Sequence, residues 1–283
     1  MRLETNTVRA ESVVVVPSAK PALRLWDRIV QSTEKRPFMT NSNRPKWIRL
    51  MTFTMAALAV AATSRAGEVP PAAQEMAKTN GLDSFAQIEA IRYTFNIEFP
   101  GAKVVRSWEW EPKTGKITFD SKDKDGNPVH VTYLRSQLSS QSDMVKNVVD
   151  PAFFNDQYWL LIPFHAIWDT SATVTDDGMQ KMSLTDASLD RISIKYSGET
   201  GYTPGDTWEL YVDADHRVEE MDYHRGGPKK PSLVIVSWAG YKKAGPLLFS
   251  TEHKGTADGA PLTQAFTNVA VKLTGSDSWI EAQ

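Results

Sequence analysis

The stretch VVRSWEWEPKTGKITFD, residues 104–120, alternates apolar and polar side chains on both sides of a short turn. Val104, Arg106, Trp108 and Trp110 lie two residues apart, so they share one face of an extended chain. The PKTG sequence at 112–115 has the composition of a tight turn, and the alternation resumes after it. This pattern predicts an antiparallel β-hairpin and sets the fold class for the rest of the chain.

The same pattern continues downstream. A second turn, DKDGN at 123–127, leads to a third strand at 129–133. Further strand-like runs, separated by turns rich in Gly, Pro and Asp, occur at 179–184, 191–196, 207–213, 217–224, 233–241, 247–252 and 266–273. Their short spacing favours an antiparallel meander over βαβ units. A sheet of roughly nine strands has to curl. We therefore predict a β-rich α+β fold, in which one or two helices cover the concave face of a single strongly curved antiparallel sheet, a half-barrel.

A helix is predicted before the first hairpin. Asp83 can cap it, and Phe85, Ile88, Ile91 and Phe95 then recur at three- and four-residue steps. A weaker helical pattern runs through residues 136–150. The apolar residues that follow Gln157 are interpreted as another strand.

Charge divides the chain in two. Residues 1–66 carry 11 Lys and Arg against 4 Asp and Glu, whereas residues 67–283 carry 21 against 30. The acidic body argues against a nucleic-acid-binding protein, since phosphate neutralisation needs a basic surface. The chain has no cysteine, which excludes disulfides, thiolate metal sites, cysteine nucleophiles and a lipidated N-terminal cysteine.

The basic segment contains a predicted secretory signal peptide at 39–66. Basic residues at 44–49 precede an apolar run at 50–62, and small residues at 64 and 66 suit cleavage near Ala66. Residues 1–38 are interpreted as an over-called start or an unstructured extension. We expect a flexible lead-in at 67–80 and a single domain at 81–283, located in the periplasm as a monomer.

Arg106 is the most informative residue of the predicted sheet, because it shares its face with Trp108 and Trp110. A charge there must be paired, reach an edge or meet a ligand head group. Aromatic and aliphatic residues at strand period form either a filled core or the lining of a cavity, and both interpretations remain open at this point. The candidate ligand-binding residues are Arg106, Trp108, Trp110, Phe119, Tyr133, Trp159, Leu161, Trp208 and Trp238.

Several of these segments carry a family resemblance. They are, in order, RSWEW at 106–110, FNDQYWLLIPFH at 154–165, WD at 168–169, GYTPGD at 201–206 and Trp238. Over roughly residues 82–274 the chain resembles a group of exported bacterial proteins of poorly characterised function, which in turn resemble the LolA/LolB superfamily of lipoprotein carriers and sorting proteins. The resemblance implies an incurved sheet, helices plugging its concave side, an apolar cavity for acyl chains and no cofactor. It also implies that Arg106 helps to hold the covering helices.

Catalytic and metal signals are weak. The sequence has no Gly-x-Ser-x-Gly, phosphate-binding Gly-rich loop or His-Glu-x-x-His. Asp156, His165 and Asp169 could converge as acid, base and orienting group, although a structural role explains them more simply. The densest His and Asp cluster is interpreted as a solvated turn, with a metal site as the alternative; its members are Asp213, Asp215, His216, Asp222 and His224.

A second weak metal signal is the DKDG sequence that starts at Asp123. It resembles the beginning of a calcium loop but lacks the loop's final Glu, so we interpret it as a hairpin turn.

Two classes of function follow. The first is a periplasmic binding or carrier protein, not an enzyme, that shelters an apolar or amphiphilic ligand such as a lipid or lipoprotein acyl chain and contacts the bacterial envelope peripherally. It would need no cofactor, metal or nucleic acid. The alternatives are an exported hydrolase that uses carboxylates such as Asp156, Asp169 or Asp206, and an envelope structural or interaction protein with a filled core.

Overall fold

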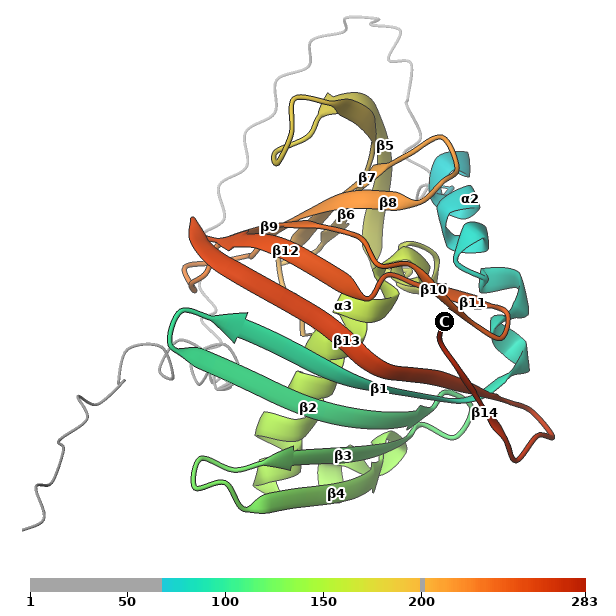
Figure 1. Cartoon of the computed structure of the whole chain (residues 1–283), viewed down its shortest axis with the longest axis vertical. Helices are drawn as coiled ribbons and strands as arrows, with labels where there is room; N and C mark the ends of the chain where they lie inside the picture. Colours follow the sequence, from blue (N-terminus) through green and yellow to red (C-terminus); the bar gives the residue numbers. More distant parts are fainter. Residues whose placement is uncertain (1–67, 199–201) are drawn as a thin grey trace, which may run out of the picture.

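The computed structural model describes residues 68–198 and 202–283, so the predicted leader at 1–66 lies outside the described residues. Twelve strands form one sheet, in the order β4-β3-β2-β1-β13-β12-β9-β8-β7-β6-β5, with β14 paired to β13 (Figure 1). Their bounds are β1 Ile88–Phe99, β2 Ala102–Glu111, β3 Lys116–Lys122, β4 Pro128–Leu134, β5 Ala172–Lys181, β6 Ser188–Tyr196, β7 Thr207–Val212, β8 Val218–His224, β9 Leu233–Ser237, β12 Glu252–Ala257, β13 Ala260–Leu273 and β14 Trp279–Glu281. A separate hairpin pairs β10 (Lys242–Ala244) with β11 (Leu247–Phe249).

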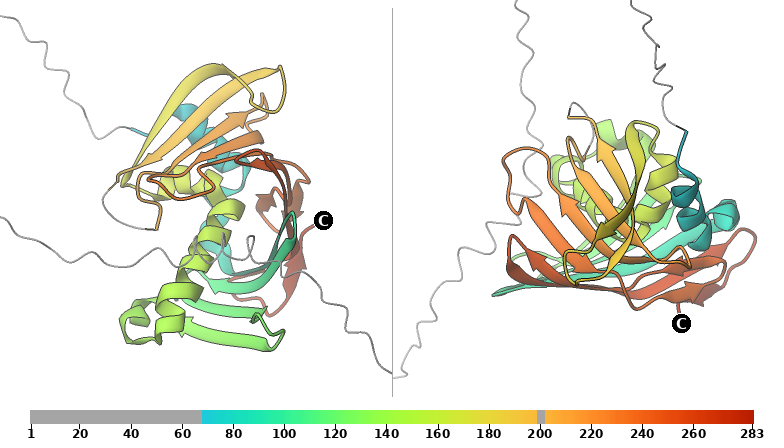
Figure 2. Two further views of the ribbon diagram at one scale, coloured as in Figure 1. Left: turned by 90° about the vertical axis from the view of Figure 1, so that its left-hand side faces the viewer. Right: turned by 90° about the horizontal axis from the view of Figure 1, so that it is seen from above.

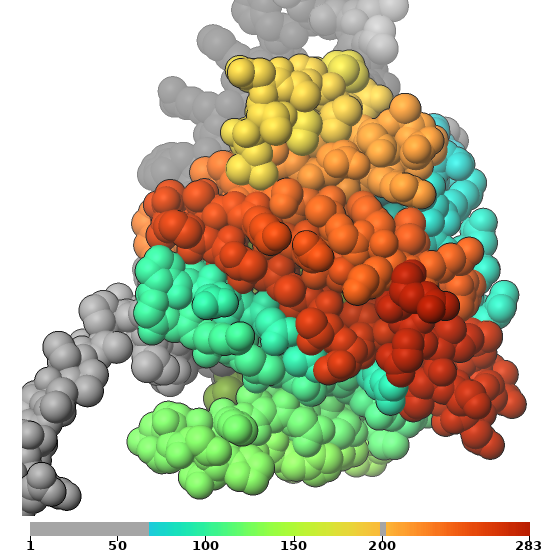
Figure 3. Space-filling model, in the orientation of Figure 1, coloured from blue at the N-terminus to red at the C-terminus, as the bar shows by residue number. Residues whose placement is uncertain are grey.

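Two meanders make up the sheet, and β13 joins them. The strands β1 to β4 follow one another as neighbours, as do β5 to β9, and β13 pairs with β1 at the centre. Figure 3 shows the face of the sheet turned away from the long helix, where β13 lies between β1 and β12. The pairings between the described strands are antiparallel, so the predicted β-rich α+β fold is confirmed.

Helix α3, Asp150–Trp168, follows a π-helical turn at Val145–Val149 and crosses one side of the sheet. Figure 2 shows the sheet bending around it, with β2–β4 and β5–β8 on opposite sides of the helix. The strand predicted after Gln157 is therefore wrong. Fourteen of the 19 residues of α3 are buried, so the helix has no polar face to reveal a 3.6-residue period. Such an apolar run cannot be told from a buried strand by periodicity.

The predicted helix that starts near Phe85 is also wrong. A 3-10 helix at Leu82–Gln87 leads directly into β1, which pairs with β2 on one side and β13 on the other. Because β1 is central and has buried residues on both faces, apolar residues occur at steps that mimic a helix. Tyr93, Phe95 and Ile97 do show the period of two expected of a strand.

The predicted flexible lead-in at 67–80 contains a helix instead. Helix α2, Pro71–Thr79, begins with a proline, whose fixed φ suits a first helical turn. Ala73, Met76 and Ala77 are buried, and the helix packs against α3. Small residues here allow close packing and do not mark a linker. Within residues 68–198 and 202–283, no helix combines the length and apolarity needed to span a membrane.

One glycine shows how closely the strands approach at the centre of the sheet. Gly255 of β12 pairs with Val236 of β9, and a Cβ atom there would lie 1.9 Å from the carbonyl oxygen of Ile235. No other residue type fits this position without a shift of the β9 backbone. The close contact keeps β9 and β12 in register, so that the two meanders form a continuous sheet.

Candidate functional site

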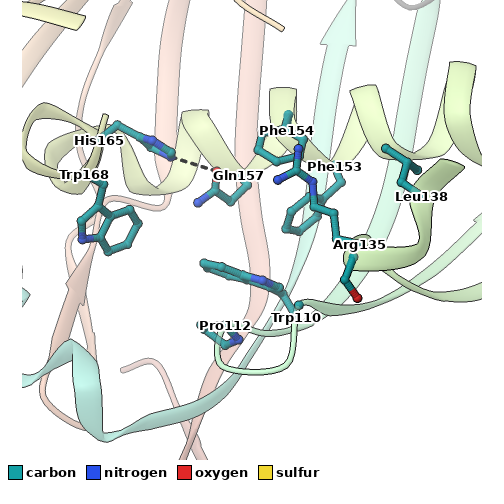
Figure 4. A pocket seen from close by; sticks show the side chains of 11 residues that line it. Trp110, Pro112, Arg135, Leu138, Phe153, Phe154, Gln157, His165 and Trp168 are labelled. Carbon is teal, nitrogen blue, oxygen red and sulfur yellow. Dashed lines mark hydrogen bonds between the residues drawn. The ribbon is translucent and has the colours of Figure 1, made fainter. Parts of the chain in front are cut away.

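A pocket of about 530 Å³ lies between α3, the β2–β3 turn and the 3-10 helix Arg135–Ser140 (Figure 4). Eleven residues line it: Trp110, Pro112, Gly115, Arg135, Ser136, Leu138, Phe153, Phe154, Gln157, His165 and Trp168. Volumes of this order are typical of small-molecule sites, which combine apolar walls with a few polar groups. The pocket lies beside α3 and not at the centre of the concave face, because α3 itself occupies that centre.

Aromatic rings form most of the pocket wall. Trp110 and Phe153 lie 5.8 Å apart between ring centroids, and Phe153 and Phe154 lie 5.4 Å apart in an edge-to-face arrangement. At the other end Trp168 contacts Phe85, whose ring also faces Trp110. This continuous aromatic surface offers contact to an apolar or flat ligand.

Arg135 provides the positive charge of the pocket. Its guanidinium carbon lies 4.0 Å from the ring centroid of Phe154, and its Nε lies 3.5 Å from Oδ1 of Asp150. The buried Asp150 carboxylate also accepts hydrogen bonds from the hydroxyls of Tyr133 and Tyr202. The Arg135 side chain is 43% exposed, so it can contact a bound anionic group without being withdrawn from water.

His165 and Gln157 are the polar groups deeper in the pocket. Nδ1 of His165 lies 3.0 Å from Oδ2 of Asp169. Nε2 of the same ring lies 2.9 Å from Oε1 of Gln157 (Figure 4). Tyr158 stacks on the imidazole with ring centroids 3.7 Å apart. These contacts hold the imidazole of His165 in one orientation against the wall of the pocket.

One oxygen of the Asp169 carboxylate is shared by three hydrogen-bond partners. Its Oδ2 accepts from the hydroxyls of Tyr158 and Tyr196 at 2.6 and 2.7 Å in addition to its contact with His165. Burial acts to raise the pKa of Asp169, but the hydrogen bonds from His165, Tyr158 and Tyr196 outweigh it and hold the pKa below its ordinary value. Asp169 is therefore an ionised residue that orients His165 and two tyrosines.

Asp156 points away from this group. It is fully buried and accepts hydrogen bonds from Nε and Nη2 of Arg106 at 2.7 and 2.5 Å. The indole of Trp108 donates to the same carboxylate at 2.8 Å, and Asn155 donates at 3.0 Å. We call Arg106, Trp108, Asn155 and Asp156 the carboxylate anchor. The expectation that Asp156, His165 and Asp169 converge is wrong for Asp156, while His165 and Asp169 do meet.

The predicted ligand-binding residues occupy different environments. Trp110 is the one that lines the pocket. The other eight are buried: Arg106, Trp108, Phe119, Tyr133, Trp159, Leu161, Trp208 and Trp238. Arg106 is paired with a carboxylate of the covering helix, which is one of the outcomes expected of a charge on the inner face.

Sequence reasoning missed most of the pocket, because it assigned α3 to a strand. Four pocket residues of α3 are spaced so that they lie along one side of a helix: Phe154 and Gln157 are three residues apart, His165 follows eight residues later, and Trp168 three residues after that. That spacing was the available signal. Arg135 and Leu138 had no such signal, because they enter the pocket through a 3-10 helix that leads from β4 to α3.

The predicted metal-ligand cluster is divided by the structure. Asp213 accepts backbone N–H bonds from Asp215 and Arg217, which is the role of a turn residue. Asp222 and His224 lie instead near Glu209, a residue that the sequence analysis did not include. Asp123 likewise accepts backbone bonds from its own turn, as the hairpin interpretation predicts.

No protein-family model matches the sequence, and no curated protein matches it significantly. Solved structures do show similarity. A DUF1329 family protein from Desulfovibrio piger is 11% identical, with 74% of this chain and 95% of that chain covered and a TM-score of 0.41. The Mycobacterium tuberculosis lipoprotein LppX is 8% identical, with coverages of 71% and 96% and a TM-score of 0.26.

A chain of the Pseudomonas aeruginosa MucA/MucB complex is 9% identical, with coverages of 76% and 99% and a TM-score of 0.24. All three likenesses are distant, with identities of 8 to 11% and TM-scores below 0.5.

Proposed function

We propose that this protein binds an apolar or amphiphilic ligand, such as a lipid or the acyl chain of a lipoprotein, in the pocket beside α3. The proposal is supported by one observation: a pocket of about 530 Å³ combines a continuous aromatic wall with one half-exposed cation, Arg135. An acyl chain would lie against Trp110, Phe153 and Phe154, while a carboxylate or phosphate head group would face Arg135.

Binding is favoured over hydrolysis by the state of the candidate carboxylates. Asp156 is held by Arg106, and Asp169 is held by His165 and two tyrosines. Asp206 accepts from the Tyr223 hydroxyl and from the backbone N–H of Gly226. Each carboxylate is used in a separate structural contact. We therefore propose a binding protein without its own catalysis, working as a monomer in the periplasm after removal of the leader.

Displacement of a ligand from the pocket tests the proposal. The probe is cis-parinaric acid, a fatty acid whose fluorescence rises in apolar surroundings. Ser136 lies at the rim of the pocket, so Ser136→Trp is expected to fill the opening and weaken binding about tenfold, or about 1.4 kcal/mol. Ser140→Trp is the matched control, since Ser140 is exposed at the other end of the same 3-10 helix and does not line the pocket.

The contribution of the head group is tested separately. Arg135→Gln should weaken binding of the free acid and leave binding of its methyl ester unchanged, because only the acid carries a charge for the guanidinium. If the wild-type protein does not bind either probe, or if Ser136→Trp binds as well as the wild type, the proposed site is wrong. Equal losses for the acid and the ester would show that Arg135 acts through packing alone.

A further inference from the structure

The face of the sheet opposite α3 carries a compact group of metal-ligating side chains on β7 and β8. Glu209 and Asp222 form a direct cross-strand pair, and His224 lies two residues along β8 on the same face. One ligand atom from each of the three residues lies within 4.8 Å of the others. Nε2 of His224 and Oε2 of Glu209 are 3.2 Å apart.

Asp222 is the unusual member of this group. It is only 3% exposed, although it lies on the outer face of the sheet. Its Oδ2 accepts a hydrogen bond from the hydroxyl of Ser183 at 2.6 Å, while its Oδ1 has no hydrogen-bond partner among residues 68–198 and 202–283. A buried carboxylate oxygen without a donor is costly, and most such atoms in proteins have a partner. The free oxygen belongs to a carboxylate that faces Glu209 across the ladder.

The burial of Asp222 comes from the tip of the β5–β6 hairpin. The backbone N–H groups of Ser183 and Leu184 donate to the carboxylate of Glu220, which is also fully buried. The hairpin tip therefore folds back over β8 and covers Asp222. This cover excludes water from one side of the group, while His224, with 46% of its side chain exposed, keeps the other side open.

Around Glu209, Asp222 and His224 the carboxylates outnumber the basic side chains that pair with them. Arg191 pairs with both Asp177 and Glu209, and it shares Glu209 with His224. Among the described residues, the hydrogen bonds that Glu220 and Asp222 accept come from neutral groups of the hairpin tip, namely the backbone of Ser183 and Leu184 and the hydroxyl of Ser183. Uncompensated carboxylates at such distances repel each other strongly where water is partly excluded. A divalent cation would remove this repulsion and would supply the partner that Oδ1 of Asp222 lacks.

We propose that Glu209, Asp222 and His224 form a binding site for a divalent transition-metal ion, with Zn²⁺ as the preferred ion. Two carboxylates and one imidazole are a donor set that zinc accepts with a fourth position left to water. The imidazole favours a transition metal over Ca²⁺ or Mg²⁺, which prefer oxygen donors. Two ligands of a tetrahedral zinc lie about 3.3 Å apart, close to the 3.2 Å between His224 and Glu209.

Zinc titration of the full chain without an affinity tag tests this site. Isothermal titration calorimetry with ZnCl₂ should show one ion per chain, and Asp222→Asn and His224→Ala should each weaken binding at least about tenfold. His130→Ala is the matched control, since His130 and Asp120 form another exposed cross-strand His–carboxylate pair, 2.7 Å apart, to which the described part of the chain adds no third ligand. It should leave zinc affinity unchanged.

Folding is controlled by the choice of variants. His224 is half exposed, so its replacement should leave the near-ultraviolet circular dichroism of the protein intact. Absence of saturable zinc binding to the wild type, or wild-type affinity in a folded His224→Ala protein, would overturn the proposal. Zinc binding that is weakened equally by His130→Ala would also overturn it, because it would show ions bound at surface histidines in general.

Discussion

Two neighbouring parts of α3 attach to the sheet by different physical means. Asp156 is attached to β2 through the carboxylate anchor, in which it pairs with Arg106 and accepts two further hydrogen bonds, from Trp108 and from its neighbour Asn155. Trp159, three residues later, enters a group of rings on the other arm of the sheet. We call this group the aromatic cluster: Trp159, Trp208, Tyr223, Trp238 and His253. The carboxylate anchor depends on directed hydrogen bonds, whereas the aromatic cluster depends on the packing of rings.

The difference explains where the pocket lies. The aromatic cluster packs α3 against β7, β8 and β12, with neighbouring ring centroids 3.8 to 6.5 Å apart. On the other arm the carboxylate anchor attaches α3 to β2, where Phe153 also packs against Trp108 and Trp110, and the pocket lies beside these contacts. Aromatic packing dominates on the first arm, whereas hydrogen bonds to Asp156 and Asp150 help to hold the second arm, and the pocket lies on the β2 side.

The largest effect is expected at the carboxylate anchor. Arg106→Met removes the cation and leaves the fully buried Asp156 unpaired, so the free energy of unfolding should fall by about 4 kcal/mol. The double variant Arg106→Met/Asp156→Leu removes both charges and should regain at least half of that loss. Urea denaturation of the three proteins checks this. A double variant as unstable as Arg106→Met would show that the pair acts through shape and not through charge.

A smaller difference separates two buried tryptophans. Nε1 of Trp108 donates to Asp156, whereas Nε1 of Trp208 is buried without a partner in the described part of the chain. Both changes to Phe create a similar cavity. Trp108→Phe also removes a hydrogen bond to a charged group, so it should destabilise the protein by about 2 kcal/mol more than Trp208→Phe. Equal losses in thermal and urea denaturation would contradict the distinction between the anchor and the aromatic cluster.

The aromatic cluster should show its own pH dependence through His253. The ring is fully buried against Trp238, and burial lowers its pKa to about 3, compared with 6.5 in the unfolded chain. Below pH 6.5 the unfolded chain binds a proton that the folded protein does not, so stability falls as the pH decreases. Between pH 7 and pH 5 this group should account for about 2 kcal/mol of lost stability.

His253→Gln isolates that contribution, because other groups titrate equally in both proteins. The variant should lose less stability than the wild type when the pH is lowered from 7 to 5, although its stability at pH 7 is reduced by the lost stacking on Trp238. Identical pH profiles for the two proteins would show that His253 becomes protonated within the folded state.

Some elements were readable from the sequence because their signals are local. The β2–β3 hairpin has strict alternation around the PKTG turn, and its strands lie within a residue or two of their predicted bounds. The Asp123 turn was equally clear. The helix α3 was misassigned because nearly all of it is buried, which removes the polar residues that mark a period, and the strand β1 was misassigned because its buried residues lie on both faces and mimic helical steps.

The candidate site depended on those misassigned elements. Trp110 was predicted because it belongs to the hairpin. Phe153, Phe154 and Gln157 belong to α3, and Arg135 belongs to the segment that leads into it. The partner of Arg106 is Asp156, 50 residues away, and no local pattern could show that the two meet.

The sequence by itself determined the antiparallel strands, the acidic and cysteine-free character of the body, and the need of Arg106 for a partner. Only the tertiary structure decided which element covers the sheet, where the pocket lies, and that Glu209 joins Asp222 and His224. The physical reason is that alternation and turn chemistry act between near neighbours, whereas the pairing of buried charges and the filling of space depend on residues that folding brings together from distant parts of the chain.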